Sequence, residues 1–93
     1  MNQTIQSGSL VIKVYDSFLR DRIEFRHDDF YYSIQKNRRI EKDDIGIVIS
    51  SLTQISGTNT FYYCVFPSQV GWAHNHNRSN LHDPDSKSLR IIE

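Results

Sequence analysis

Several short stretches of the chain alternate between apolar and polar residues with a period of two, which is typical of β-strands. The first covers residues 10–15, LVIKVY, where β-branched side chains favour a strand over a helix in so short a run. Another begins at residue 45 and carries an isoleucine at every second position. We expect one shared core to receive four isoleucines: Ile12, Ile45, Ile47 and Ile49.

The clearest pattern consists of two apolar runs, at residues 45–50 and 61–66, joined by a polar loop at residues 56–59. The loop contains Gly57 and Asn59, which tolerate the positive φ angles of tight connections. An antiparallel hairpin is therefore expected here.

Further strands are expected beyond this hairpin. Pro67 has no backbone N–H and should end the run before it. Residues 68–69 then form a tight turn into residues 70–73, where Gly71 permits close approach of another segment. After a polar loop, a closing strand is predicted at residues 88–92.

Residues 18–42 are compatible with two structures. The four-residue spacing of Leu19 and Ile23 suits one or two helical turns, whereas the alternation of apolar and charged residues around Ile23 suits a strand. Residues 30–41 resemble a hairpin arm with Asn37 at its turn. We expect a long excursion from the sheet and a candidate functional element, because connections of this length are uncommon.

Length and composition indicate one domain. The 93 residues are 38% hydrophobic and carry eleven basic and eleven acidic side chains, so no overall field attracts nucleic acid or an anionic membrane. We expect a flexible N-terminus over residues 1–8 and one domain over residues 9–93. No apolar run approaches the roughly 20 residues that span a bilayer, and no secretory pattern opens the chain. These features predict a reducing, intracellular location.

The expected order of about five strands, with a long insertion after the first, is similar to an SH3-like barrel. The likeness rests on DIGIVI at residues 44–49, YCVFP at 63–67, VGWAH at 70–74, and Leu81. These residues look like those of the small one-domain SH3-like proteins of tailed bacteriophages. The resemblance implies a mainly β antiparallel barrel, a viral protein of the host cytoplasm or the virion, and it supplies no catalytic residue.

Catalytic and metal chemistry find little support. His74 and His76 are two residues apart, and His82, Asp83 and Cys64 add possible ligands, but the paired Cys-x-x-Cys or His-x₃₋₅-His spacing of structural zinc sites is absent. Cys64 lies in the middle of an apolar strand, where burial raises a thiol pKa and limits access. We therefore expect no enzyme activity, no metal and no cofactor.

Amphipathic aromatic residues favour protein binding, because they are enriched at interaction hot spots. Trp72 suits a core position equally well. If these aromatic residues bind a protein, we expect the partner to be a host or phage protein, and we expect no membrane binding. The candidate partner-binding residues are Tyr31, Tyr32, Tyr62, Trp72 and His74.

The alternative is nucleic-acid binding through a basic hairpin tip, made of Lys36, Arg38, Arg39 and Lys42. These cations stand beside tyrosines, which combines phosphate-neutralising with base-stacking groups. Acidic residues within 41–44 and the zero net charge cancel much of this patch. Salt separates the two hypotheses, because a phosphate-driven complex weakens steeply as salt rises.

Overall fold

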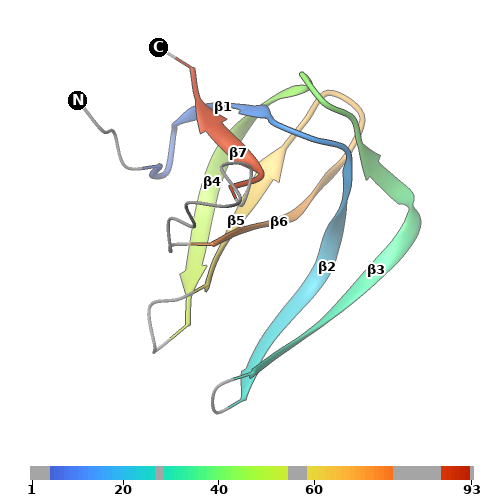
Figure 1. Cartoon of the computed structure of the whole chain (residues 1–93), viewed down its shortest axis with the longest axis vertical. Helices are drawn as coiled ribbons and strands as arrows, with labels where there is room; N and C mark the ends of the chain where they lie inside the picture. The colour runs from blue at the N-terminus through green and yellow to red at the C-terminus, as the bar shows by residue number, and fades with distance from the viewer. Residues whose placement is uncertain (1–4, 27–28, 55–58, 77–86, 93) are drawn as a thin grey trace, which may run out of the picture.

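The computed structural model describes residues 5–26, 29–54, 59–76 and 87–92; the side chains of residues 26–37 and 76 lie outside this description. The described residues form one antiparallel sheet of seven strands and contain no helix (Figure 1). The strands are β1 (Leu10–Lys13), β2 (Ser17–Arg26), β3 (Asp29–Ile40), β4 (Ile45–Thr53), β5 (Asn59–Val65), β6 (Val70–His76) and β7 (Leu89–Ile91).

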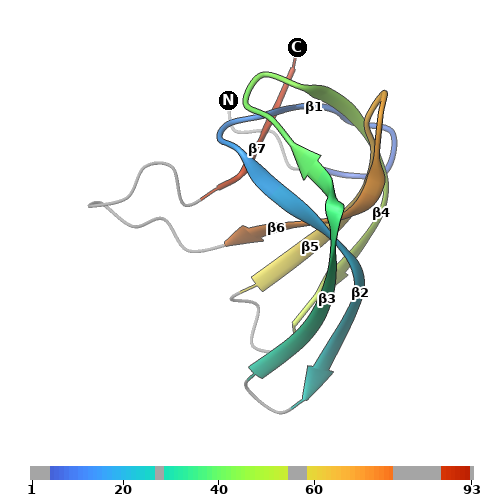
Figure 2. The same cartoon turned by 90° about the vertical axis from the view of Figure 1, so that its right-hand side faces the viewer.

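The strands follow the order β3-β2-β6-β5-β4-β1-β7 across a sheet that curls into a half-barrel (Figure 2). Strands that are neighbours in sequence form the hairpins β2–β3, β4–β5 and β5–β6. Strand β1 lies between β4 and β7, with Leu10 opposite Ile47 and Val11 opposite Ile91. The mainly β, antiparallel prediction is thus confirmed, with seven strands among the described residues instead of about five.

The described part of residues 18–40 belongs to β2 and β3, which are strands of this same sheet. Strands β2 and β3 pair from Ser17 opposite Ile40 to Arg26 opposite Asp29, so the strand alternative is correct. The predicted turn at Asn37 is wrong, because β3 continues through Asn37 to Ile40. The predicted excursion is the hairpin of β2 and β3, which is part of the sheet. The two strands stabilise each other along a ladder with register shifts between Phe18 and Arg22, and a loop of the same length lacks such pairing.

The hairpin of β2 and β3 joins the other strands through β6, where Arg20 lies opposite Trp72. Gly71 makes this approach possible, as its sequence position predicted. A Cβ atom at Gly71 would lie 2.9 Å from Cβ of Leu19 and 3.0 Å from the carbonyl oxygen of Arg20. Any side chain at position 71 would therefore push β2 away from β6.

Several strand ends and turns lie where the sequence predicts them. Strand β5 ends at Val65, before Pro67, and the N–H of Phe66 donates to the carbonyl oxygen of Gln69 at 2.8 Å to close the turn into β6. Strand β7 is the predicted closing strand. Of the predicted loop at residues 56–59, Asn59 begins β5 and the rest lies outside the described residues, as does Leu81.

The N-terminal stretch predicted to be flexible lies partly against the sheet. The N–H of Gly8 donates to the carbonyl oxygen of Val48 at 2.7 Å, and the hydroxyl of Ser7 donates to that of Ile49 at 3.1 Å. Ile5 packs against the core cluster. Residues 1–4 lie outside the described residues.

The core occupies the inner, concave face of the curled sheet, and this face is not the predicted one. Ile45, Ile47 and Ile49 are 50%, 39% and 48% exposed, whereas Val48 is fully buried. Ile12 lies opposite Ile45 on the outer face. The buried apolar residues that pack together are Val11, Leu19, Ile40, Val48, Tyr62, Cys64, Phe66, Ala73 and Leu89.

Close packing inside the curl explains why the smaller residues of β4 face inward. A Cβ atom built at Gly46 would lie 2.8 Å from two ring carbons of Phe66. At position 46 the inner face therefore has room for glycine but not for isoleucine. A register shift between Val48 and Ser50 then interrupts the alternation of β4, which the period-two pattern could not anticipate.

Adjacent alanine substitutions in β4 test this assignment. We expect Val48→Ala to lower the free energy of unfolding by about 2 kcal/mol, because two buried methyl groups are removed and a cavity remains. The same change at half-exposed Ile47 should cost less than about 1 kcal/mol. Urea denaturation of both variants measures the difference. A larger loss for Ile47→Ala than for Val48→Ala would restore the inward isoleucine row.

Candidate interaction surface

Aliphatic side chains form a continuous row on the outer face of the sheet. Pairing places Leu10 opposite Ile47, Ile47 opposite Val65, and Val65 opposite Val70. The row crosses β1, β4, β5 and β6, about 14 Å at the usual strand spacing. Leu10 and Val65 are 49% and 41% exposed, so the row faces outward.

A second, shorter row lies beside the first, where Ile12 pairs with Ile45. No charged residue occupies the part of either row that lies on β1, β4, β5 or β6; beyond β1, the second row ends at Arg90 of β7, which lies opposite Ile12. Contiguous exposed apolar surface is uncommon on a monomeric protein and marks interaction sites. We call this surface the outer patch, and its residues are Leu10, Ile12, Ile45, Ile47 and Val65.

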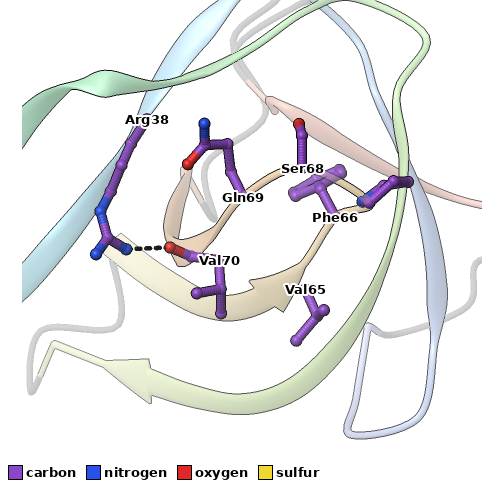
Figure 3. A pocket seen from close by; sticks show the side chains of 7 residues that line it. Arg38, Val65, Phe66, Ser68, Gln69 and Val70 are labelled. Carbon is purple, nitrogen blue, oxygen red and sulfur yellow. Dashed lines mark hydrogen bonds between the residues drawn. The ribbon is translucent and has the colours of Figure 1, made fainter.

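A pocket of about 320 Å³ adjoins the outer patch at Val65 (Figure 3). Arg38 forms one wall of the pocket. Its side chain is held in place because its Nη1 donates to the carbonyl oxygen of Val70 and its Nε lies 2.6 Å from Oδ1 of Asp21. These contacts hold β3 against the start of β6 and fix the shape of the pocket. The lining residues are Arg38, Val65, Phe66, Pro67, Ser68, Gln69 and Val70.

Of the aromatic residues predicted to bind a partner, those whose side chains the structure describes do not form one exposed surface. Tyr62 is 9% exposed and belongs to the core. Trp72 is half-buried and packs edge-on against Tyr63, with ring centroids 5.0 Å apart. Trp72 and Tyr63 are on the outer face, next to the row that contains Val65 and Val70. Trp72 therefore lies at the border of the outer patch and is not one of its central residues.

His74 is held by neighbours on both sides. Its Nε2 lies 2.8 Å from Oδ1 of Asn59, and its ring stacks on Phe61 with centroids 4.5 Å apart. Because the amide nitrogen of Asn59 donates to Gln54 at 2.7 Å, the Oδ1 atom accepts and the His74 Nε2 donates. This network orders the end of the β5–β6 hairpin, a structural role.

Tyr31 and Tyr32 lie on β3, opposite Glu24 and Ile23, and their side chains lie outside the described residues. The same is true of Lys36. The structure therefore places their backbone in the sheet and leaves their predicted binding roles as predictions.

The predicted basic tip is a strand and is partly neutralised. Arg38 is paired with Asp21, and Nη2 of Arg39 donates to Oδ2 of Asp16 at 2.8 Å. The N–H of Lys42 donates to the other carboxyl oxygen of Asp16 at 2.7 Å. This backbone hydrogen bond, together with the Arg39 cation, lowers the pKa of Asp16. Two of the four proposed cations are thus engaged in ion pairs.

Two ionisable side chains, Lys13 and Cys64, lie inside the core instead of at the surface. Lys13 is 1% exposed; its Nζ is 3.4 Å from the carbonyl oxygen of Ser88 and 4.4 Å above the ring of Tyr15. Burial lowers the pKa of Lys13 to about 8 and raises that of the Cys64 thiol to about 12. Cys64 is fully buried, so the prediction of an inaccessible thiol with a raised pKa is confirmed.

No cluster of three potential metal ligands occurs among the described residues, which exclude His82 and Asp83. Within the same residues there is no helix long and apolar enough to cross a bilayer. Comparisons with protein-family models, with curated proteins and with solved structures give no match.

The sequence did not predict the outer patch as a functional surface, because three of its residues, Ile12, Ile45 and Ile47, were expected in the core. The signal was present in β5, where both faces are apolar, and in β4, where glycine and isoleucine alternate. A small sheet that buries one face leaves the other face to a partner or to water. The alternation of Gly46 with large residues indicates which face is crowded.

Proposed function

We propose that this chain is a non-enzymatic, SH3-like protein-interaction module of phage type that docks a partner protein through the outer patch. The observation that carries the proposal is the run of exposed aliphatic side chains across β1, β4 and β5. Its place of action would be the cytoplasm of an infected cell or a virion. The partner presents an apolar surface, because only such a surface compensates for removing this patch from water.

Docking would use the outer patch as the apolar centre and the adjoining pocket as a recess for one side chain. Arg38, Ser68 and Gln69 supply a polar rim around the apolar wall of this pocket. Such an arrangement resembles ordinary interfaces, which have an apolar centre and a polar rim. Trp72, at the border, would add contact area. The tyrosines at positions 31 and 32 remain candidate contacts.

Protein docking has better support than nucleic-acid binding. Arg38 and Arg39 are each paired with an aspartate, and the chain has no net charge. A nucleic-acid site needs cations that replace the counterions of phosphate groups. No described feature of the β3 strand favours that use over structural ion pairing.

Two variants of the same strand test the proposal. Ile47 and Leu52 are both on the outer face of β4 and both 39% exposed, but only Ile47 belongs to the outer patch. We expect immobilised Ile47→Asp protein to retain at least about tenfold less of the proteins that wild type captures from nuclease-treated host lysate. Leu52→Asp protein should capture as wild type does. Thermal melts verify that both variants fold.

The opposite pattern would support the electrostatic alternative. If Ile47→Asp captures normally, while reversal of Arg38 and Arg39 to glutamate or addition of salt removes the bound material, docking through the outer patch is wrong.

A further inference from the structure

The outer patch has charges of opposite sign on its two flanks. Arg90 of β7 lies across the ladder from Ile12, on one side. Asp43 lies at the edge beyond the start of β4, two residues before Ile45, and its N–H donates to the carbonyl oxygen of Lys13 at 2.8 Å. Both side chains are exposed. Within the part of the chain that the structure describes, neither has a hydrogen-bond or ion-pair partner.

We propose that the outer patch docks a second copy of this chain, and that Arg90 of each copy pairs with Asp43 of the other. The proposal rests on the proposed function, because it names the partner of the same surface. A two-fold interface brings a patch against itself, so the patch must be self-complementary. An uncharged aliphatic centre with one basic and one acidic flank satisfies this condition.

A simple geometry satisfies both the apolar and the charged contacts. With a two-fold axis parallel to the strands and passing over β1, the side chains of Ile12 and Leu10 meet their own copies. The same rotation places β7 of one copy over the beginning of β4 in the other, since β7 and β4 are the two neighbours of β1. Arg90 then lies against the end of β4 that Asp43 precedes.

Overall charge favours a second copy over a strongly charged partner. Eleven basic and eleven acidic residues give the chain zero net charge, so two copies approach without net repulsion. Proteins near zero net charge associate more readily than highly charged ones. Because the outer patch consists of five residues, whereas a standard interface has about 20–30 residues on each side, we expect a weak, reversible dimer.

Sedimentation equilibrium of the full chain, from about 10 µM to about 1 mM, covers the dissociation constants of small interfaces. We expect a reversible monomer–dimer equilibrium in wild type. Ile47→Asp should raise the dimer Kd at least about tenfold, and the matched variant Leu52→Asp should leave it unchanged. Wild-type protein that stays monomeric, or Ile47→Asp protein that dimerises as wild type does, would overturn the proposal.

A double-mutant cycle tests the flank pairing. Arg90→Glu should raise the dimer Kd about tenfold, because it places two acidic groups in contact. In an Asp43→Asn background the same change should cost no more than about threefold. Asparagine is chosen because Asp43 has φ of 75°, a conformation that asparagine also tolerates. Strictly additive effects would show that the two flanks do not meet.

The two proposals fail separately. A monomeric wild-type chain whose captured protein is lost in Ile47→Asp leaves the docking function in place and removes only the second copy as partner. Capture that is indifferent to Ile47→Asp, together with a monomeric chain, removes both.

Discussion

Replacement of Lys13 by methionine is expected to raise the free energy of unfolding at pH 7 by roughly 3 kcal/mol. The ammonium group is buried, and the protein provides one long hydrogen bond to Ser88 and the ring of Tyr15 in place of its water. The pKa falls from 10.5 to about 8, and each unit corresponds to about 1.4 kcal/mol. Methionine keeps the unbranched shape without the charge. Urea denaturation measures the gain, and Lys42→Met at an exposed position is the control.

The pH dependence of stability gives an independent signature of Lys13. Below pH 8 the lysine is charged in both states, so the full cost of burying the charge is present. Between pH 8 and 10.5 the unfolded chain binds more protons than the folded one, and stability rises with pH by up to about 1.4 kcal/mol per unit. This rise should be absent from Lys13→Met. An equal rise in that variant would show that other groups cause it.

Cys64 acts in the opposite direction at higher pH. Its thiol pKa is raised from 9.0 to about 12, so above pH 9 the unfolded chain loses a proton that the folded chain retains. Stability therefore falls between pH 9 and 12. In the wild type the contributions of Lys13 and Cys64 nearly cancel between pH 9 and 10.5, and above pH 10.5 only the fall due to Cys64 remains. In Cys64→Ala the rise should continue beyond pH 9, which chemical denaturation at several pH values can follow.

Gly46→Val is expected to lower the free energy of unfolding by about 3 kcal/mol, near the upper end of the usual cost of overpacking. Even the Cβ atom would lie 2.8 Å from the ring of Phe66, which is itself 3% exposed, so the ring or the β4 backbone must shift. The γ-methyl groups of valine add to the conflict. Thermal or urea denaturation measures the loss.

A second substitution identifies the cause of that loss. In a Phe66→Leu background the ring is gone, so Gly46→Val should cost at least about 1 kcal/mol less than in the wild type. If the cost is the same in both backgrounds, the ring is not the obstacle, and the conformation of the β4 backbone must be responsible.

Local sequence pattern was sufficient to place most strands. The runs at β1, β4, β5, β6 and β7 combine β-branched or aromatic residues with a turn signal at each end, as Pro67 does after β5. These signals depend only on neighbouring residues. They identify a strand wherever it later pairs, which is why the all-β class was predictable.

The choice of face was not predictable in the same way. In β4 both alternating sets are compatible with burial, and the larger isoleucines are the more apolar set. The ring of Phe66, twenty residues further along the chain, decides that Gly46 and Val48 face inward. Burial therefore depended on a non-local contact. The outer patch depended on the same choice of face, because its aliphatic residues are exposed only when Gly46 and Val48 face inward.

The second region that sequence could not define is β2–β3. Its helical and extended interpretations differ by little in local preference, and only the ladder between Ser17 and Ile40 decides between them. Such pairing energy belongs to two strands together. This pairing energy cannot be deduced from the sequence of either strand alone.

The position of β1 between β4 and β7 has a consequence for the kinetics of folding. The three hairpins can each form by closing a short loop, but the contact of Lys13 with Leu89 joins segments from opposite ends of the described chain. Closing so long a loop costs entropy before any contact compensates for it. We expect β7 to add last, onto an edge that β1 has already formed. Until then the edge of β1 is an unpaired strand, and aggregation during refolding would begin there.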